Sequence, residues 1–561
     1  MTDRCSRRVA ALGRVDIDVS DLCNDLADPG ETAQGIPYCI TPRDTAASAA
    51  ARRLYPMQSR DPVGTTTTSA MLRPGLNRLG CGQHHLVRMV TGAALTSIAV
   101  CAVSAILLAR PAVAQQSSNG FGLTPSFEES TLNIPTPQPA APPQPAAPPD
   151  PAADNFLFGD WGGMRSYLDN HGIDFNLDYT TETAGNVSGG LRRGVDYADQ
   201  FGFQLDIDWD KLAGITGFST HLNIVHRDGR NLSSDYIGDN VIQAQEIFGA
   251  GFGTALRDVW LYGEQKAFDN RLDFVFGRVF PGMDFAASPL YCNFMTLTIC
   301  GHPRALTQEQ GFIDWPLSTW GGRLRARPTK ETYVMFGVYA SEPFPAGGTS
   351  GWDWSTNRVT GAYYATELGW EPVFGASQLP GHYKIGFAYD TSAFPDNLVD
   401  VNGQPFVLSG LPPRVQHGRG QFWATFDQML MRTGPDEGLT VLAAYAHDDA
   451  DNSLYQHFIW AGLLYSGFWQ ARPHDQIGLG ITYYKLAPSL TQTETLEQEF
   501  DLPPTYEFGV QKHAMVFEAN YQLPVFRGVT VQAEMEYFLR PGGVSGVPNA
   551  FVLGLKTHVS F

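Results

Sequence analysis

Runs of strictly alternating apolar and polar residues recur from residue 173 onward, and they constrain the fold more than any other feature. The run from Ile173 to Tyr179 has apolar residues at odd positions and Asp or Asn at even positions. Similar runs lie at 203–209, 218–224, 383–389, 477–483 and 529–537. Successive side chains of a strand point to opposite faces, so each run predicts a strand with one apolar and one polar face. Turn residues separate the runs, and the sequence therefore predicts an all-β fold.

The final stretch, residues 551–561, is another run of this kind. Phe551, Leu553 and Leu555 share one predicted face, and the chain ends on the strand itself at Phe561. A soluble edge strand can alternate in the same way. An ending on an aromatic residue without a polar tail nevertheless resembles the last strand of bacterial outer-membrane barrels, which closes the wall.

Composition excludes several classes of protein. The mean hydropathy of −0.17 is too low for a helical protein with many membrane spans. Aromatic residues make up 12% of the 561 residues and charged residues only 17%, a balance that fits a barrel wall with aromatic girdles. The formal net charge of −19 argues against a nucleic-acid partner, because phosphate binding needs a basic surface.

The beginning of the chain indicates export. We interpret residues 1–70 as disordered or as a mis-assigned start, with Met71 as the initiator. Residues 71–114 are predicted to be a signal peptide, because a basic segment precedes an apolar core and a small-residue site that ends at Ala114. An uncleaved membrane anchor is the alternative, since the core is about long enough to span a bilayer.

Two further features follow from export. Cys292 and Cys300 are the only cysteines after Ala114, and in an oxidising compartment they predict one small disulfide rather than a metal site. Residues 115–154 are rich in Pro and Ala and are predicted to form an extended periplasmic spacer. The folded part is expected over 155–561.

The folded part is predicted to be a transmembrane antiparallel β-barrel, preceded by a short helix that ends at Gly172. About 400 residues, at about 25 for each strand and its connection, give on the order of 16 strands. A β-sandwich has shorter strands, and a propeller or β-helix needs a repeat of fixed period, which the chain lacks. A soluble lectin or β-rich glycosidase stays open if no strand faces lipid.

Several motifs in order resemble the carbohydrate-selective porin family, often called OprB porins. They begin with the Trp-Gly-Gly-Met-Arg of residues 161–165 and end with the Tyr-Phe-Leu-Arg-Pro-Gly-Gly of residues 537–543. Between them lie Asn186–Gly190, Asp208–Gly214, Val259–Leu261 and Cys300–Pro303. Each motif is weak alone, whereas their order covers about 155–561.

The resemblance implies an outer-membrane barrel of 16 strands, commonly trimeric, through which sugars diffuse into the periplasm. Glucose-like monosaccharides and related polyols are the expected solutes, and outer-membrane lipid and lipopolysaccharide the expected surroundings. We expect a homotrimer without a cofactor, and we expect no enzymatic activity.

Two groups of residues are candidates for the pore lining. Trp260, Tyr262 and Glu264 alternate with Val259 and Leu261, so the two rings and the carboxylate should face water if the two aliphatic residues face lipid. Sugars offer hydroxyl groups to polar side chains and a C–H face to aromatic rings. The alternative is that both rings belong to an interfacial girdle.

The second group is charged. Arg323, Arg325 and Arg327 share one face, and charge on the lipid face at mid-depth costs about 2–4 kcal/mol, so we expect these arginines in the lumen. Glu534 and Glu536 are expected across the lumen with the opposite sign. The alternative is that the arginines only pair with acidic neighbours and hold the barrel rigid.

Arg278 has the parity of the apolar residues Phe274 and Phe276. We expect it beyond the membrane edge, at a bulge, or on a loop that folds into the lumen, and we include it among the pore-lining candidates. A disulfide between Cys292 and Cys300 would stiffen such a loop.

Other functions remain as alternatives. A general or ion-selective diffusion porin would share all these features. A barrel-scaffolded hydrolase is less favoured, because the chain has no G-x-S-x-G or H-E-x-x-H motif. The Pro- and Ala-rich spacer cannot form the plug domain of an energy-coupled transporter.

Overall fold

The computed structural model describes residues 155–247, 256–344 and 350–561. The predictions for residues 1–154, namely the mis-assigned start, the signal peptide and the spacer, lie outside the described residues. In the part of the chain that is described, no helix is both long and apolar enough to cross a membrane.

The described residues form one sheet of long antiparallel strands. The strands are β1 (Ile173–Ser188), β2 (Gly194–Asp208), β3 (Phe218–Gly229), β4 (Leu256–Ala267), β5 (Leu272–Val279), β6 (Thr319–Ala326), β7 (Thr332–Ser341), β8 (Gly361–Trp370), β9 (Val373–Phe374), β10 (Leu379–Asp400), β11 (Pro413–Arg432), β12 (Gly438–Asp448), β13 (Tyr455–Ser466), β14 (Gln476–Leu486), β15 (His513–Phe526), β16 (Val529–Leu539) and β17 (Ala550–Ser560). Because β9 is a two-residue extension and β8 pairs directly with β10, sixteen strands build the wall.

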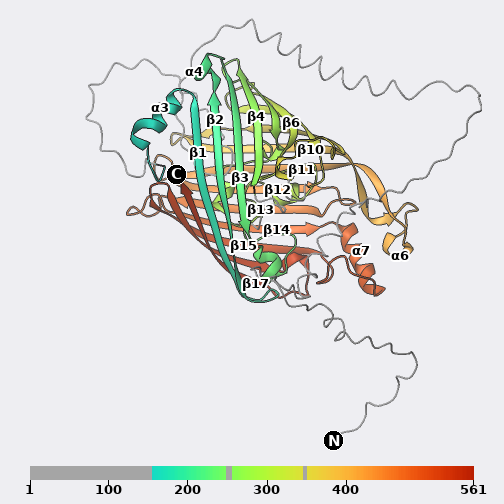
Figure 1. Cartoon of the computed structure of the whole chain (residues 1–561). Coiled ribbons are helices and arrows are strands. Elements are labelled where there is room, and N and C mark those ends of the chain that lie inside the picture. Colours follow the sequence, from blue (N-terminus) through green and yellow to red (C-terminus); the bar gives the residue numbers. More distant parts are fainter. Residues whose placement is uncertain (1–154, 248–255, 345–349) are drawn as a thin grey trace, which may run out of the picture. The chain divides into compact units, whose positions relative to one another are not determined.

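The sheet closes on itself through its first and last strands. β1 pairs with β2 on one side and with β17 on the other, where Glu182 is the register partner of Lys556. Every other wall strand pairs with its neighbours in sequence, so no edge is left open among the described strands (Figure 1). The predicted closed antiparallel barrel of sixteen strands is confirmed.

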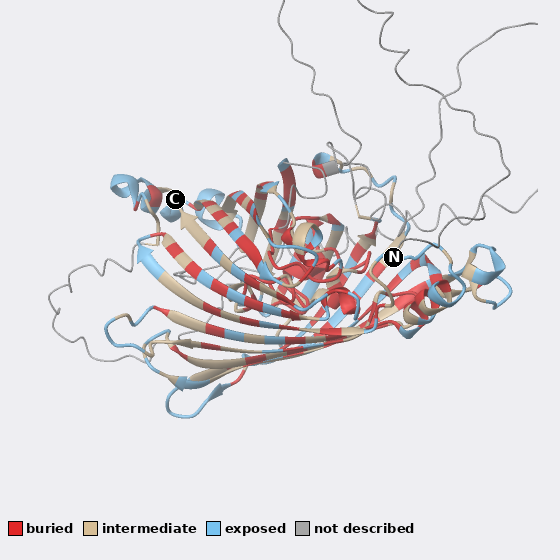
Figure 2. Cartoon of the chain, turned by 90° about the horizontal axis from the view of Figure 1, so that it is seen from below, coloured by how far each residue is buried: buried red, intermediate tan, exposed pale blue. Residues whose placement is uncertain are grey.

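The alternation in the sequence sorts side chains between the two faces of this wall. Figure 2 shows buried and exposed positions alternating along the strands. On β17, Leu553 and Leu555 are exposed on the outer face, while Val552 and Lys556 are buried inside. Many other exposed outer residues are also large and apolar, among them Phe274, Phe276, Leu324, Phe336, Ile385, Phe387, Leu479, Ile481 and Met535. The outer face therefore suits lipid and the inner face suits water.

The helices lie in the connections between the strands. They are η2 (Trp161–Gly163), α3 (Met164–Asn170), α4 (Trp209–Ala213), η3 (Ser233–Ile237), η4 (Pro281–Met283), η5 (Tyr291–Asn293), α5 (Arg304–Thr307), η6 (Ser350–Trp352), α6 (Phe406–Ser409), α7 (Pro488–Glu499) and η7 (Pro541–Gly543). Most of them lie at the rims of the wall, whereas η4, η5 and α5 belong to a connection that lies inside the barrel. The predicted helix before Gly172 is confirmed as α3. The predicted strand over 203–209 ends one residue early, because Asp208 caps α4 with its side chain.

The N-terminal helix is tied to the last residue of the chain. Arg165, at the second position of α3, donates hydrogen bonds to the carbonyl oxygens of Phe561 (2.6 Å) and Phe175 (2.9 Å). The Leu157 amide donates to the Ser560 carbonyl at 2.7 Å. These bonds fix the end of β17 beside the start of β1, where the barrel closes.

The hydrophobic core lies inside the barrel rather than between layers. The long connection between β5 and β6, residues 280–318, supplies buried rings that pack against wall tryptophans. Phe294 lies 5.0 Å from Trp460 and Phe285 lies 6.2 Å from Trp423, measured between ring centroids. We call residues 280–318 the infolded loop.

An arginine in place of Leu555, near the middle of β17, should destabilise the barrel by about 2–4 kcal/mol, because the guanidinium would sit on the lipid face at mid-depth. The matched variant Val559→Arg lies near the end of the same strand and should cost about 0–1 kcal/mol. Urea unfolding in lipid vesicles measures both. Equal costs would contradict the assignment of a lipid-facing surface to this strand.

Candidate functional site

The three arginines predicted to face the lumen are held in ion pairs on the inner wall. Arg323 of β6 reaches Asp273 of β5 at 2.8 Å and Asp284 of the infolded loop at 3.0 Å. Arg325 binds the same Asp273 at 2.6 Å. Each guanidinium is thus neutralised by a carboxylate of a neighbouring segment.

Arg327, just past the end of β6, follows the same rule. Its Nη1 lies 2.6 Å from Glu371 Oε2, and both side chains remain about a quarter exposed. The side chains of Arg325 and Arg327 are the more accessible of the three, whereas Arg323 is 4% exposed. Arg325 and Arg327 therefore remain available to a solute, while Arg323 is enclosed.

Beside these arginines, β2, β3 and β4 hold a polar and aromatic group on the inner wall. His221 stacks on the Tyr262 ring at 4.6 Å, and its Nδ1 lies 2.5 Å from Asp206. On its other side, Nε2 lies 3.7 Å from Glu264, which also lies 3.6 Å from Arg323. We call Asp206, His221, Tyr262 and Glu264 the ring-and-carboxylate group.

Trp260 occupies the same face but is buried. Its ring packs against Trp315 of the infolded loop, with centroids 5.2 Å apart. Val259, predicted to face lipid, is fully buried instead. A bulge opposite Asn223 and Ile224 breaks the alternation at this point, and the sequence carries no clear signal of it.

The structure corrects the prediction for Arg278. Its register partners are Leu261 and Trp320, two exposed residues of the outer face, and its guanidinium lies over the Trp320 ring. Trp320 and Trp354 meet edge to face at 6.4 Å. Arg278 is therefore buried outside the lumen, because loop residues cover it, and it does not line the pore.

Carboxylates of the inner wall hold the backbone of the infolded loop. Glu367 of β8 accepts from the Ala286 amide at 2.8 Å. Glu518 of β15 accepts from the Met295 amide and the Thr296 hydroxyl, both at 2.5 Å. Backbone amides buried away from water need such acceptors, so the wall carboxylates fix the loop across the lumen.

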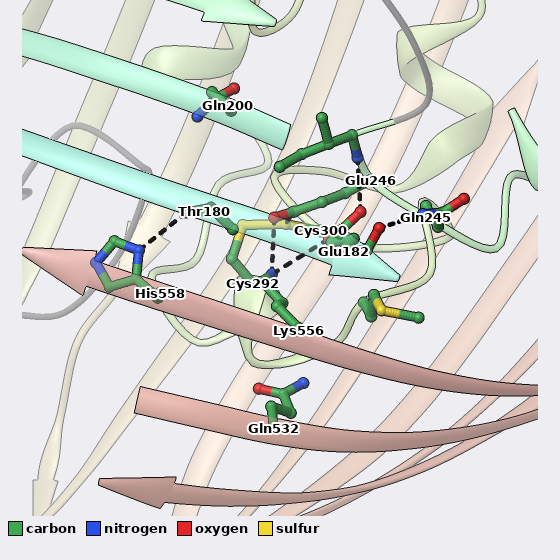
Figure 3. A network of polar contacts seen from close by, with 12 residues as sticks. Thr180, Glu182, Gln200, Gln245, Glu246, Cys292, Cys300, Gln532, Lys556 and His558 are labelled. Carbon is green, nitrogen blue, oxygen red and sulfur yellow. Dashed lines mark hydrogen bonds and ion pairs between the residues drawn. A yellow bond between two sulfur atoms is a disulfide. The ribbon is translucent and has the colours of Figure 1, made fainter. Parts of the chain in front are cut away.

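A second anchor joins the loop between β3 and β4 to the barrel closure. Lys556 of β17 lies 2.7 Å from Glu246 and 3.8 Å from Glu182 of β1 (Figure 3). The structure joins Cys292 and Cys300 by a disulfide, and Cys300 Sγ contacts the Glu246 carboxylate. Both loops therefore meet at one point of the wall.

Glu534 and Glu536 lie on the inner face of β16 but not in open water. Glu534 is 4% exposed and accepts from the Gln532 amide, and Glu536 is fully buried. Neither Glu536 oxygen has a hydrogen-bond partner among the described residues. The structure does not bring these carboxylates face to face with the arginines of β6 as ion-pair partners, since those arginines pair with other acids.

Several inward polar residues were not predicted. Gln200 of β2 accepts from Arg227 Nε at 2.6 Å and from Trp315 Nε1 at 2.9 Å. Arg304 of the infolded loop donates to Gln243 at 3.0 Å. The alternation marks Gln200 and Arg227 as polar-face residues, but nothing in the sequence places Trp315 or Arg304 inside the barrel.

The chain is similar to known proteins in both sequence and fold. Residues 192–561 match the model of the "Carbohydrate-selective porin, OprB family". Porin B of Pseudomonas aeruginosa is 32% identical over 418 residues, which cover 72% of this chain and 91% of that protein. The chain belongs to this family. A structure of Pseudomonas putida OprB at high pH matches with a TM-score of 0.69 and 31% identity, over 73% of this chain and 99% of that one.

As an OprB-family porin, the chain is an outer-membrane protein, and the two rims of its barrel can be assigned. The short connections 268–271, 327–331 and 527–528 share one rim, as antiparallel pairing requires, and the infolded loop and residues 487–512 begin at the other. Bacterial barrels have short periplasmic turns and long extracellular loops. The long-loop rim therefore faces outward from the cell.

Burial raises the pKa values of two carboxyl groups in the outer loops of the porin. Burial raises the pKa of Glu494 in α7 to about 8, and Glu494 accepts from the Gln511 amide at 2.7 Å. Burial also raises the pKa of Asp239, which accepts from the amides of Val241 and Ile242. Both side chains hold loop backbone at the outer rim.

Glu518→Gln should loosen the infolded loop by about 1–3 kcal/mol, because an amide cannot accept all the bonds that the carboxylate accepts from Met295 and Thr296. Hydrogen–deuterium exchange of residues 285–300 measures the effect. Glu536→Gln is the matched control, since Glu536 is the register partner of Glu518 and has no hydrogen-bond partner among the described residues. Equal exchange in both variants would contradict the anchoring role.

The raised pKa of Glu494 predicts a pH dependence of the outer loop. The folded pKa of about 8 exceeds the ordinary 4.5, so the stabilisation is complete below pH 4.5 and is lost as pH rises through 8. Hydrogen–deuterium exchange measures the opening free energy of residues 487–512 in the wild type and in Glu494→Gln. The wild-type value minus the variant value should fall as the pH rises across this window. A difference that rises with pH would contradict the assignment.

Proposed function

We propose that this chain forms a water-filled pore in the outer membrane through which glucose-like monosaccharides and related polyols diffuse passively into the periplasm. No cofactor and no bond chemistry are part of the proposal. The observation that carries it is the ring-and-carboxylate group beside ion-paired arginines on the inner wall.

Ion pairing within the wall favours uncharged solutes. An unpaired guanidinium in a narrow lumen attracts anions and a lone carboxylate attracts cations. Arg323, Arg325 and Arg327 each bind a carboxylate, so their fields largely cancel at a distance. Their hydrogen-bonding atoms still serve the hydroxyl groups of a sugar at short range, which argues for a sugar pore over an ion-selective one.

The accessible part of the proposed solute path lies on β4 and β6. Tyr262 offers a ring face to the C–H surface of a sugar, and Glu264, Arg325 and Arg327 offer acceptors and donors. We propose that Trp260 and Arg323 position this group from behind, because both are buried. Glu534 and Glu536 then support the wall beneath the infolded loop.

The remaining proposals concern export and assembly. We propose that the signal peptide is cleaved after Ala114 and that the Cys292–Cys300 disulfide stiffens the infolded loop. We further propose contact with outer-membrane lipid and lipopolysaccharide, and a homotrimer. The exposed rings of Trp320, Trp352 and Trp354 outside the wall support a contact with a neighbouring barrel.

Tyr262→Ala should weaken glucose binding in the pore about three- to ten-fold, because the loss of one stacking contact is worth about 0.5–1.5 kcal/mol. Conductance for simple salts should stay the same or rise, because the lumen becomes wider. Planar-bilayer recordings with glucose, a disaccharide and potassium chloride measure both quantities.

Tyr364→Ala is the control for this experiment, since Tyr364 of β8 is exposed on the outer face. It should leave glucose binding unchanged. A wild-type pore that passes salts but neither binds nor passes glucose would overturn the proposed function.

A further inference from the structure

One row of basic side chains crosses four neighbouring strands on the outer face of the barrel. His447 of β12 is the register partner of His457 of β13, which is the partner of Lys485 of β14, which is the partner of His513 of β15. All four side chains are partly exposed. With Lys512 and Arg540, both exposed next to this row, we call them the basic row.

The row lies at the outer edge of the lipid-facing band. Two residues farther into the membrane, the same strands carry the row Tyr445, Ile459, Tyr483 and Met515. The row beyond that is Ala443, Ala461, Ile481 and Phe517. Two residues of a strand span about 7 Å, so the basic side chains lie about one headgroup layer above the row that contains Tyr445 and Tyr483.

The rim assignment places the basic row in the outer leaflet. Lys485 lies at the end of β14 from which the long connection containing α7 leaves, and His513 begins β15 after it. Long connections are extracellular in bacterial barrels. The groups that face the basic row are therefore the headgroups of the outer leaflet.

Positive charge at this position stands out in an acidic chain. The formal net charge is −19, and elsewhere on the outer face the register pair Asp199 and Asp228 carries acidic groups. The charges of Lys485, Lys512 and Arg540 all act on the His513 ring. Lys485, Lys512 and Arg540 thus form a local cationic patch within the basic row, and its natural partner is an anion.

The histidine rings are already oriented. His447 Nδ1 lies 2.7 Å from the Gln456 carbonyl, and His457 Nδ1 lies 3.0 Å from the Tyr445 hydroxyl. The two rings lie 5.0 Å apart. With each Nδ1 engaged by the protein, both rings are held in place beside Lys485, the cation of this row.

We propose that the basic row binds the lipid A phosphates of lipopolysaccharide. Juxtamembrane basic residues attract anionic headgroups, and the apolar rows beneath accept the acyl chains. The inference rests on the lipopolysaccharide contact proposed above and locates that contact at the basic row. It does not depend on sugar transport.

Binding of lipid A to the detergent-solubilised full-length mature porin tests the proposal. The variant Lys485→Gln/Arg540→Gln should bind lipid A about ten-fold more weakly than wild type, because two cations at the surface are lost. The control Arg271→Gln/Lys330→Gln removes the same charge from exposed residues at the short-turn rim and should bind like wild type. Lys485→Arg/Arg540→Lys should restore binding.

Native mass spectrometry with three probes separates the sources of the anion. Lipid A should bind more tightly than lipid A without its phosphates and more tightly than phosphatidylglycerol. Equal loss in the test and control variants, or equal binding of the three probes, would overturn the proposal. Glucose conductance should be unchanged in every variant, so a failure of lipid binding is distinguishable from a failure of the sugar pore.

Discussion

The hydrogen bonds from wall carboxylates to the infolded loop are the interaction on which the pore depends. A loop that crosses a barrel has no ladder of its own, so its buried amides must find acceptors elsewhere. Glu367 of β8 and Glu518 of β15 supply them from two separate strands of the wall. The same carboxylates would be costly on the outer face, where lipid offers no partners. The polar inner face of the wall therefore has two roles. It makes the lumen hydrophilic, and its carboxylates bind the infolded loop.

Closure of the wall and placement of the loop are joined at one point. Lys556 sits opposite Glu182 in the pairing of β17 with β1 and also reaches Glu246 from the loop between β3 and β4. The Cys292–Cys300 segment of the infolded loop contacts the same Glu246. A buried lysine between two carboxylates is stable only with good geometry. The correct pairing of the last strand thus also forms the site where the β3–β4 loop and the infolded loop contact the wall.

The sequence predicts what depends on period two and fails where the period breaks. The alternation places Leu553 and Leu555 outside and Arg323 and Arg325 inside, because each side chain of a strand points to one of only two faces. A bulge buries Val259, and covering by Trp320 and Trp354 buries Arg278 outside the lumen. The infolded loop has no period at all, so the positions of Trp315 and Arg304 depend on packing between distant segments. Glu536 shows the same limit, since its inward face was predictable but its complete burial was not.

The inner and outer faces of the wall use charge in opposite ways. Inside, Arg325 and Asp273 lie 2.6 Å apart, and such pairing leaves donors and acceptors without a long-range field. A neutral polyol gains from this arrangement, because it exchanges hydrogen bonds with water and wall at little cost, whereas an ion finds no net attraction. Outside, Lys485 forms no ion pair among the described residues, so its field extends toward the leaflet. Selectivity for an uncharged solute and the proposed attachment to an anionic lipid surface are compatible in one chain, because the two sets of charges lie on opposite faces of the wall.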